Sequence, residues 1–226
     1  MPKITQKKML TQDMLELHLE KPEGLDYQAG QFVQFEIPVE GQIVKRSYSL
    51  ASTPSDEDLS FCIKILPQQL NGPASAYLPT LSVGDEIAIG PVRGRFCVSE
   101  PSDLVLIATG AGIAPIIGIV RDELENRGTP KNVYLLFGLR HEDDVFWKDV
   151  FDQLVERYPN FHYTLTLSRP SDTWTGTRGR VTDHVQNHID NDAKYFLCGS
   201  PNMVKDVRSF LVEQKVDPKK IHFEIF

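Results

Sequence analysis

Cysteine is scarce in this chain, which has 3 cysteines among 226 residues: Cys62, Cys97 and Cys198. They lie far apart and form no CxxC pair. A cluster held by four thiolates is therefore excluded, and a zinc site is disfavoured. An odd, scattered set of thiols is typical of a reducing compartment, so we expect a cytoplasmic protein.

Long apolar runs and an excess of basic charge are also missing. The longest window without a charged residue, 104–120, contains three glycines and a proline, so it predicts no membrane span. The first ten residues contain no apolar core of a signal peptide. The formal net charge is −7, and acidic residues outnumber basic ones in both halves of the chain. No basic half is left to bind nucleic acid or anionic lipid.

The first hundred residues show the period of half-buried strands. Apolar and polar residues alternate over 15–19, 33–37 and 59–65, and turn-forming residues separate these runs. With 41% apolar and 24% charged residues, the chain can bury a true core. We predict an N-terminal antiparallel β-barrel over residues 1–99.

After a polar stretch at 99–103, strands alternate with helices. The predicted strands are 104–109, 133–137, 162–167, 195–198 and 221–226. The helices between them are predicted at 113–127, 147–158, 181–189 and 202–215. This order indicates a C-terminal α/β domain, residues 104–226, with a doubly wound parallel five-stranded sheet.

Two segments could carry chemistry. Residues 108–115, Ala-Thr-Gly-Ala-Gly-Ile-Ala-Pro, join the first strand and helix of the α/β half, where glycines and a helix N-terminus suit a phosphate. Pro115 replaces the last glycine of GxGxxG, so a simple tight turn is an alternative. Residues 46–52 offer a guanidinium, an aromatic ring and hydroxyls, although alone they favour a polar strand edge.

The order of several motifs is more specific than any one of them. These motifs are RxYSxxS at 46–52, Gly-Pro-Ala-Ser at 72–75, Gly-Pro at 90–91, GxGIAP at 110–115, Cys-Gly-Ser-Pro at 198–201 and His-Phe-Glu-Ile-Phe at 222–226. Together they resemble the ferredoxin-NADP reductase family over nearly the whole chain. The resemblance implies an FAD-binding barrel and an NAD(P)H-binding α/β domain, with nicotinamide meeting flavin in the cleft between them.

The resemblance also assigns roles to residues. It implies that Ser49, Cys198, Glu224 and Phe226 are catalytic: Ser49 bonds near flavin N5, Cys198 lies beside the reacting nicotinamide carbon, Glu224 supplies a proton and Phe226 covers the flavin. The expected cofactor-binding residues are Arg46, Ser47, Tyr48, Ser49, Gly72, Pro73, Ala74, Ser75, Thr109, Gly110, Gly112, Arg140, Ser168, Arg169, Arg178, Arg180 and Phe226. Of these, Arg46 and the 72–75 turn would hold the flavin pyrophosphate, and Tyr48 would pack beside the isoalloxazine.

The nicotinamide cofactor is predicted from arginines. Residues 164–182 contain Arg169, Arg178 and Arg180 but one acid, Asp172. Guanidinium groups suit a ribose 2′-phosphate, so we expect NADPH, with NADH possible and a solvated arginine cluster as the alternative. His184 and His188 stand four apart without the glutamate of HExxH, and we expect no metal.

The predicted function is hydride transfer between NADPH and FAD, with single electrons passing to or from a separate carrier, a ferredoxin or flavodoxin. One alternative is an NAD(P)H:flavin reductase or the reductase component of an oxygenase. Another is a non-catalytic electron-relay or nucleotide-sensing subunit. Residues 67–71 contain no tyrosine or tryptophan to stack on adenine, so FAD is expected to be bent or loosely held.

Overall fold

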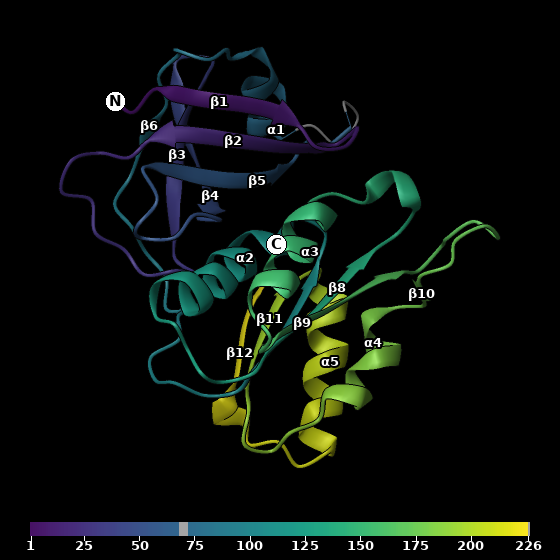
Figure 1. Ribbon diagram of the computed structural model, residues 1–226. Helices are drawn as coiled ribbons and strands as arrows, with labels where there is room; N and C mark the ends of the chain where they lie inside the picture. Colours follow the sequence, from purple (N-terminus) through teal and green to yellow (C-terminus); the bar gives the residue numbers. More distant parts are fainter. Residues whose placement is uncertain (68–71, 226) are drawn as a thin grey trace.

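The barrel and the α/β part are distinct bodies in this computed structural model, which describes residues 1–67 and 72–225 (Figure 1). The barrel strands, purple to blue, lie at one end, and the green and yellow elements form the other. Within the described ranges, no helix is long and apolar enough to cross a membrane.

Two antiparallel three-stranded sheets form the barrel. The first is β1 (Ile4–Met9), β2 (Met14–Glu20) and β5 (Asp58–Lys64), and the second is β4 (Gln42–Ser49), β3 (Phe32–Val39) and β6 (Ala88–Ile89). Backbone bonds join the sheets on both sides: Ile4 N donates to Asp85 O and Ala51 N to Ser60 O, each at 2.8 Å. The predicted alternation is confirmed, because Leu15 and the other inward residues fill the core between the sheets.

A short helix covers part of the barrel core. Helix α1 (Pro73–Tyr77) begins after Gly72 and continues into the 3₁₀ turn η2 (Leu78–Thr80). Ala74 and Leu78 are buried against the core of the barrel. The apolar contacts of these two residues therefore hold the start of α1 beside the sheet that contains β4.

The α/β part has a parallel sheet in the order β10-β9-β8-β7-β11-β12. Its strands are β7 (Leu104–Thr109), β8 (Val133–Leu139), β9 (Phe161–Leu167), β10 (Thr177–Arg178), β11 (Lys194–Gly199) and β12 (Ile221–Ile225). Five of them match the predicted strands. The sixth, β10, is a two-residue addition at the sheet edge, too short to leave a periodic pattern.

Helices cover both faces of this sheet. Helices α2 (Ile113–Arg121) and α3 (Lys148–Arg157) share one core cluster, whereas α4 (Val181–His184) and α5 (Pro201–Glu213) share another. The remaining turns are η3 (Gly110–Gly112), the π turn η4 (Asp122–Asn126), η5 (Glu142–Asp144), η6 (Val185–His188) and η7 (Pro218–Lys220). The predicted helices 113–127 and 181–189 thus end in a π turn and a 3₁₀ turn.

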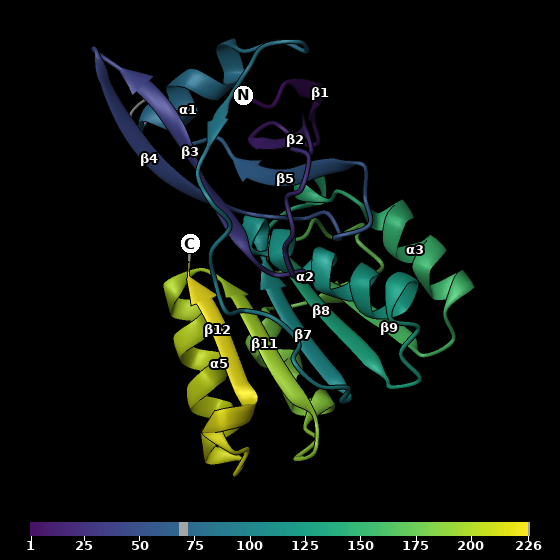
Figure 2. The same cartoon turned by 90° about the vertical axis from the view of Figure 1, so that its left-hand side faces the viewer.

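The carboxyl ends of the parallel strands face the barrel (Figure 2). Helix α2 passes directly beside it, because a Cβ built on Gly118 would lie 3.1 Å from Leu50 O and 3.2 Å from Ser52 O. Arg121, at the end of α2, forms a two-point ion pair with Asp56 of the barrel, with nitrogen–oxygen distances of 2.7 and 3.0 Å. The domains therefore meet where the predicted site residues lie.

Candidate active site

A cavity of about 230 Å³ lies between the barrel and the beginning of α2. Many of its lining residues are those expected for FAD: Arg46, Ser47, Tyr48, Ser49, Gly72, Ala74 and Ser75. The others are Cys62, Ile63, Lys64, Leu66, Ala111 and Ala114. Strands β4 and β5, the short helix α1, the glycine loop and the start of α2 therefore meet at this cavity, which brings the first two motifs together.

Strand β4 presents the aromatic ring of this cavity and one of its two cations, Arg46, and β5 presents the other, Lys64. The Tyr48 ring packs on Phe35 with centroids 4.7 Å apart, and burial raises the pKa of its hydroxyl to about 12, so it stays neutral. Arg46 is exposed, and its guanidinium donates to its neighbour's carbonyl, Lys45 O, at 2.9 Å. A planar apolar wall thus lies beside an exposed cation.

Ser49 is the most informative residue of the cavity. It is 4% exposed, and within the described part of the chain its Oγ has no hydrogen-bond partner. A buried hydroxyl without a partner is costly, so the site is one that a ligand atom would complete. Together with Tyr48 and Arg46, this hydroxyl fits FAD, which combines a flat ring with polar edges and a pyrophosphate.

The 72–75 turn forms another wall. Gly72 precedes α1 with extended backbone, and no side chain caps this helix end. Ser75 Oγ accepts a bond from Leu66 N at 3.0 Å, which ties the helix to the segment after β5. Pro73 occupies the first turn of α1, where a missing N–H costs nothing.

The glycine loop and the Cys-Gly-Ser-Pro motif lie in contact at the carboxyl ends of β7 and β11. A Cβ on Gly112 would lie 2.3 Å from Cys198 O, so only glycine fits this approach. Ser200 N donates to Thr109 Oγ1 at 3.3 Å, and Gly110 has a φ of +55°. Motifs almost ninety residues apart therefore form one surface.

Cys198 and Glu224 are direct neighbours across β11 and β12. Burial raises the pKa of Glu224 to about 7. Burial, and then the charge of Glu224, raise the pKa of Cys198, so its thiol stays protonated. A carboxyl that titrates near neutral pH can take up or release a proton there. Phe226 lies outside the described residues.

The predicted nucleotide residues lie at the ends of β8 and β9. Arg169 N donates to Arg140 O at 2.8 Å, and Ser168 N donates to Leu139 O at 3.0 Å. These bonds hold the ends of the two strands together, with the side chains of Arg140 and Arg169 exposed. Arg180 is also exposed, immediately before α4.

Arg178 is engaged differently. Its guanidinium donates to three backbone carbonyls, those of Ser171, Asp172 and Trp174, at 2.9, 3.2 and 2.7 Å. In this arrangement the side chain stabilises the turn that follows Arg169. Sequence spacing assigned Arg169 and Arg178 to the same task, but their surroundings differ.

The cavity includes residues that sequence reasoning missed. Ala111 and Ala114 reach the flavin side from the α/β part, and Cys62 reaches it from β5. Cys62 was noted for its isolation, and Ala111 and Ala114 lie in the glycine-loop segment without a role assigned to them. Alternation in 59–65 marks two faces of a strand but does not say which face meets a cavity.

Comparison with known proteins matches two families. Residues 2–97 match the Oxidoreductase FAD-binding domain, and residues 106–209 match the Oxidoreductase NAD-binding domain. The chain is 32% identical to ferredoxin–NADP reductase B of Sorangium cellulosum, covering 92% of this chain and 90% of that protein. It is 31% identical to the phenol hydroxylase P5 protein of Acinetobacter pittii, covering 94% of this chain but 60% of that protein.

Solved structures agree on the fold. A cytochrome P450 reductase from Amycolatopsis superposes with a TM-score of 0.88 at 28% identity, over 100% of this chain and 68% of the other. A ferredoxin NADP⁺ reductase from Neisseria gonorrhoeae with bound FAD and NADP superposes with a TM-score of 0.85 at 23% identity. The match covers 99% of this chain and 97% of the other. The two-domain arrangement is therefore shared with FAD- and NADP-containing reductases.

Proposed function

The chain belongs to the ferredoxin-NADP reductase family, with an FAD-binding and an NAD(P)-binding domain, and on that premise we propose that it transfers a hydride between NADPH and bound FAD. Electrons then pass singly to or from a separate carrier protein. The observation that carries the proposal is the Ser49 hydroxyl, which has no hydrogen-bond partner among the described residues and lies in a cavity built from both domains.

The chain's own residues would position this chemistry. The flavin accepts a hydride and releases single electrons when it is bound. Ser49 would donate a hydrogen bond to the flavin ring edge, and Tyr48 would orient the ring by packing against it. Arg46 and the first turn of α1 would hold the pyrophosphate by charge and by backbone N–H groups.

Glu224 would hold the proton that accompanies the transfer. Its pKa near 7, raised by burial, keeps both protonation states accessible at neutral pH. Cys198 is paired with it across the strands and would supply a neutral, close-packed wall for the nicotinamide. The arginines at the ends of β8 and β9 would read the 2′-phosphate, which favours NADPH over NADH.

The carrier is proposed to be an acidic ferredoxin or flavodoxin in the cytoplasm. Two cations, Arg46 and Lys64, line the cavity of a chain whose net charge is −7. Lys64 lies 3.0 Å from Asp13, so its charge is partly compensated. Because Arg46 is assigned to the flavin pyrophosphate and Lys64 is paired with Asp13, the proposal of an acidic carrier rests on the family of the chain, which includes ferredoxin–NADP reductases, and not on local positive charge. The cytoplasmic location rests on three free cysteines.

A second candidate is the reductase component of an oxygenase. Several relatives bear such names, including the toluate 1,2-dioxygenase electron transfer component of Pseudomonas putida, 29% identical over 89% of this chain. The chain spans about 60% of the length of that relative and of the phenol hydroxylase protein. In this case the acceptor would be an oxygenase component.

Anaerobic stopped-flow reduction tests the proposal. Protein loaded with FAD is mixed with NADPH or NADH, and flavin absorbance is followed before ferredoxin, flavodoxin or an oxygenase component is added. We expect faster reduction by NADPH, and a rate at least tenfold lower in Ser49→Ala than in the matched variant Ser82→Ala, whose serine is exposed. A protein that binds no flavin under any condition would overturn the proposal.

A further inference from the structure

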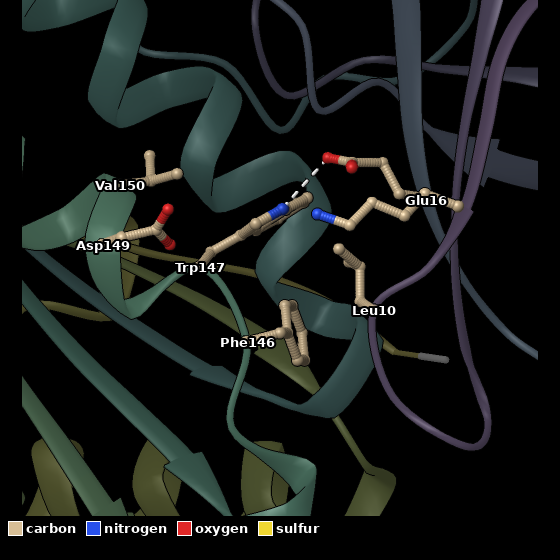
Figure 3. Close-up of a pocket in the computed structure, with 7 residues that line it drawn as sticks. Leu10, Glu16, Phe146, Trp147, Asp149 and Val150 are labelled. Carbon is tan, nitrogen blue, oxygen red and sulfur yellow. Dashed lines mark hydrogen bonds between the residues drawn. The ribbon is translucent and has the colours of Figure 1, made fainter.

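A second cavity lies between the two domains. It measures about 290 Å³, and its lining residues are Lys8, Leu10, Glu16, Phe146, Trp147, Asp149 and Val150. Figure 3 shows Leu10 and Glu16 from the barrel facing Phe146 and Trp147 from the α/β part. A hydrogen bond crosses the cavity, from Trp147 Nε1 to Glu16 Oε1 at 3.0 Å.

Trp147 adopts a backbone conformation that bulky residues avoid. Its φ is +55° and its ψ is 16°, in the left-handed region, directly before α3. Its neighbour Phe146 is buried against Phe137, with ring centroids 5.6 Å apart, so the chain is anchored just before the unfavourable residue. Strained residues persist where surrounding contacts hold them, and they gather at functional sites.

Glu16 is a suitable acceptor for the indole. Its side chain is 15% exposed, and His18 Nε2 lies 3.8 Å from the same Oε1. The pKa of Glu16 is held below its ordinary value by His18 and by the indole N–H, against the opposing effect of burial. The acceptor is therefore a carboxylate, and hydrogen bonds to ionised acceptors are stronger than neutral ones.

The position of this bond links it to both cofactor regions. Glu16 pairs with Cys62 across β2 and β5, and Cys62 lines the flavin cavity. Trp147 ends the connection that begins with Arg140 at the carboxyl end of β8. One hydrogen bond thus ties the connection after a predicted nucleotide residue to the strand pair of the flavin cavity.

We propose that Trp147 and Glu16 are positioning residues, whose bond fixes the α/β domain against the barrel at the separation that hydride transfer requires. The inference rests on the proposed function. Hydride transfer needs near-contact geometry, and a misplacement of about 1 Å remote from the chemistry can cost on the order of a hundredfold in rate.

Matched variants test the bond. Trp147→Phe keeps an aromatic ring but removes the N–H, Glu16→Ala removes the acceptor, and Glu16→Gln keeps an acceptor oxygen. Tyr163→Phe is the control, because it removes an aromatic donor that bonds Asp152 within the α/β domain. Single-turnover flavin reduction gives the rate, and titration with NADP⁺ gives the dissociation constant.

We expect hydride transfer about tenfold slower in Trp147→Phe and in Glu16→Ala, with nucleotide affinity changed less than about twofold. The double variant should be no slower than either single variant, because both remove one bond. Glu16→Gln should give a rate between those of the original protein and Glu16→Ala, because it keeps an acceptor oxygen without the charge. Tyr163→Phe should stay close to the original rate. Unchanged rates in the first two variants, or an equal loss in Tyr163→Phe, would overturn the positioning role.

Hydrogen exchange of the cofactor-free protein provides a readout that does not depend on activity. Segments 14–18 and 140–147 should exchange about tenfold faster in Trp147→Phe and Glu16→Ala than in Tyr163→Phe. Unchanged exchange contradicts the bond as a domain contact. If the original protein transfers no hydride at all, the proposed function fails, and the role in transfer fails with it. If the original protein transfers hydride and the rates of Trp147→Phe and Glu16→Ala equal its rate, the positioning role alone is overturned.

Discussion

The proposed flavin side of the site, around residues 46–49 and 72–75, and the proposed nucleotide side, at the ends of β8 and β9, are built in different ways. On the flavin side, residues 46–49 and 72–75 form walls around a cavity, and Ser49 is buried with its hydroxyl unpartnered within the described chain. On the nucleotide side, Arg140, Arg169 and Arg180 are exposed at the ends of separate elements. A preformed cavity suits a resident cofactor, whereas an open edge suits a substrate that must enter and leave.

The largest expected effect comes from the contact between the glycine loop and the Cys-Gly-Ser-Pro motif, both in the α/β part. Gly112→Ala should destabilise the fold by about 3 kcal/mol, because the added Cβ would lie 2.3 Å from Cys198 O and 2.7 Å from Gly199 N. Urea unfolding measures the loss. Gly90→Ala is the control, because its added Cβ would come no closer than 3.7 Å to another residue and Gly90, like Gly112, is not among the glycines with positive φ. An equal loss in both variants would show that the close approach is unimportant.

Arg46→Ala tests the flavin side. We expect FAD affinity to fall about 30-fold, or about 2 kcal/mol, because the pyrophosphate would lose its charged hydrogen bond from the guanidinium. Calorimetric titration of the flavin-free protein measures it. Arg208→Ala, which removes an exposed arginine on α5, should leave the affinity intact. Equal affinities in both variants would remove Arg46 from the flavin site.

Arg169 and Arg178 are expected to affect nucleotide binding in different ways. Arg169→Ala should weaken NADPH binding about tenfold and leave NADH unchanged, because an exposed guanidinium is available to the 2′-phosphate. Arg178→Ala should instead weaken both nucleotides to a similar extent, since its three carbonyl bonds hold the adjacent turn. Titration of each variant with NADPH and with NADH measures the two dissociation constants. Selective NADPH loss in Arg178→Ala alone would reverse the two assignments.

The smallest expected effect concerns Glu224 and pH. The folded protein holds this proton up to a pKa of about 7, whereas the ordinary value is 4.5, so the folded state is favoured at low pH. The stabilisation is present below pH 4.5 and is lost as pH rises through 7. Between pH 5 and 8, the free energy of unfolding of the original protein should fall by about 1 kcal/mol relative to that of Glu224→Gln, after allowance for solvent screening. If urea unfolding gave the same difference in stability between the original protein and Glu224→Gln at pH 5 and at pH 8, the assigned pKa would be wrong.

Much of the fold follows from local patterns. Alternation in 15–19 requires one face of a strand to be buried, and the apolar run 104–109 requires burial on both faces, so the two fold classes were predictable. The two-residue strand β10 and the π turn at Asp122–Asn126 were not. Strand β10 depends on its pairing with β9, which the bond from Gly179 N to Leu167 O extends, and the π turn contacts the barrel through the bond from Ser55 Oγ to Asn126 Oδ1. Such contacts leave no periodic signal.

The site was predictable only in part, for a similar reason. Motif order brought Arg46, Tyr48 and Ser49 to the flavin side, yet it did not indicate Ala111 or Cys62 as lining residues. Nor could spacing separate Arg178 from Arg169. Whether a guanidinium is free for a phosphate depends on the carbonyls that the folded turn places around it.

The sequence by itself determined the barrel and the doubly wound sheet, because strand period and helix period are set by neighbouring residues, and the order of its motifs carried the resemblance to the family. Tertiary structure alone decided which distant groups meet: Gly112 against Cys198 within the α/β part and, between the two parts, Ala111 beside the cavity that Ser49 lines and Trp147 bonded to Glu16. The physical reason is the sequence separation over which each effect acts. Local propensities act over a few residues, whereas burial, close approach and hydrogen bonding across the cleft depend on residues up to 131 positions apart.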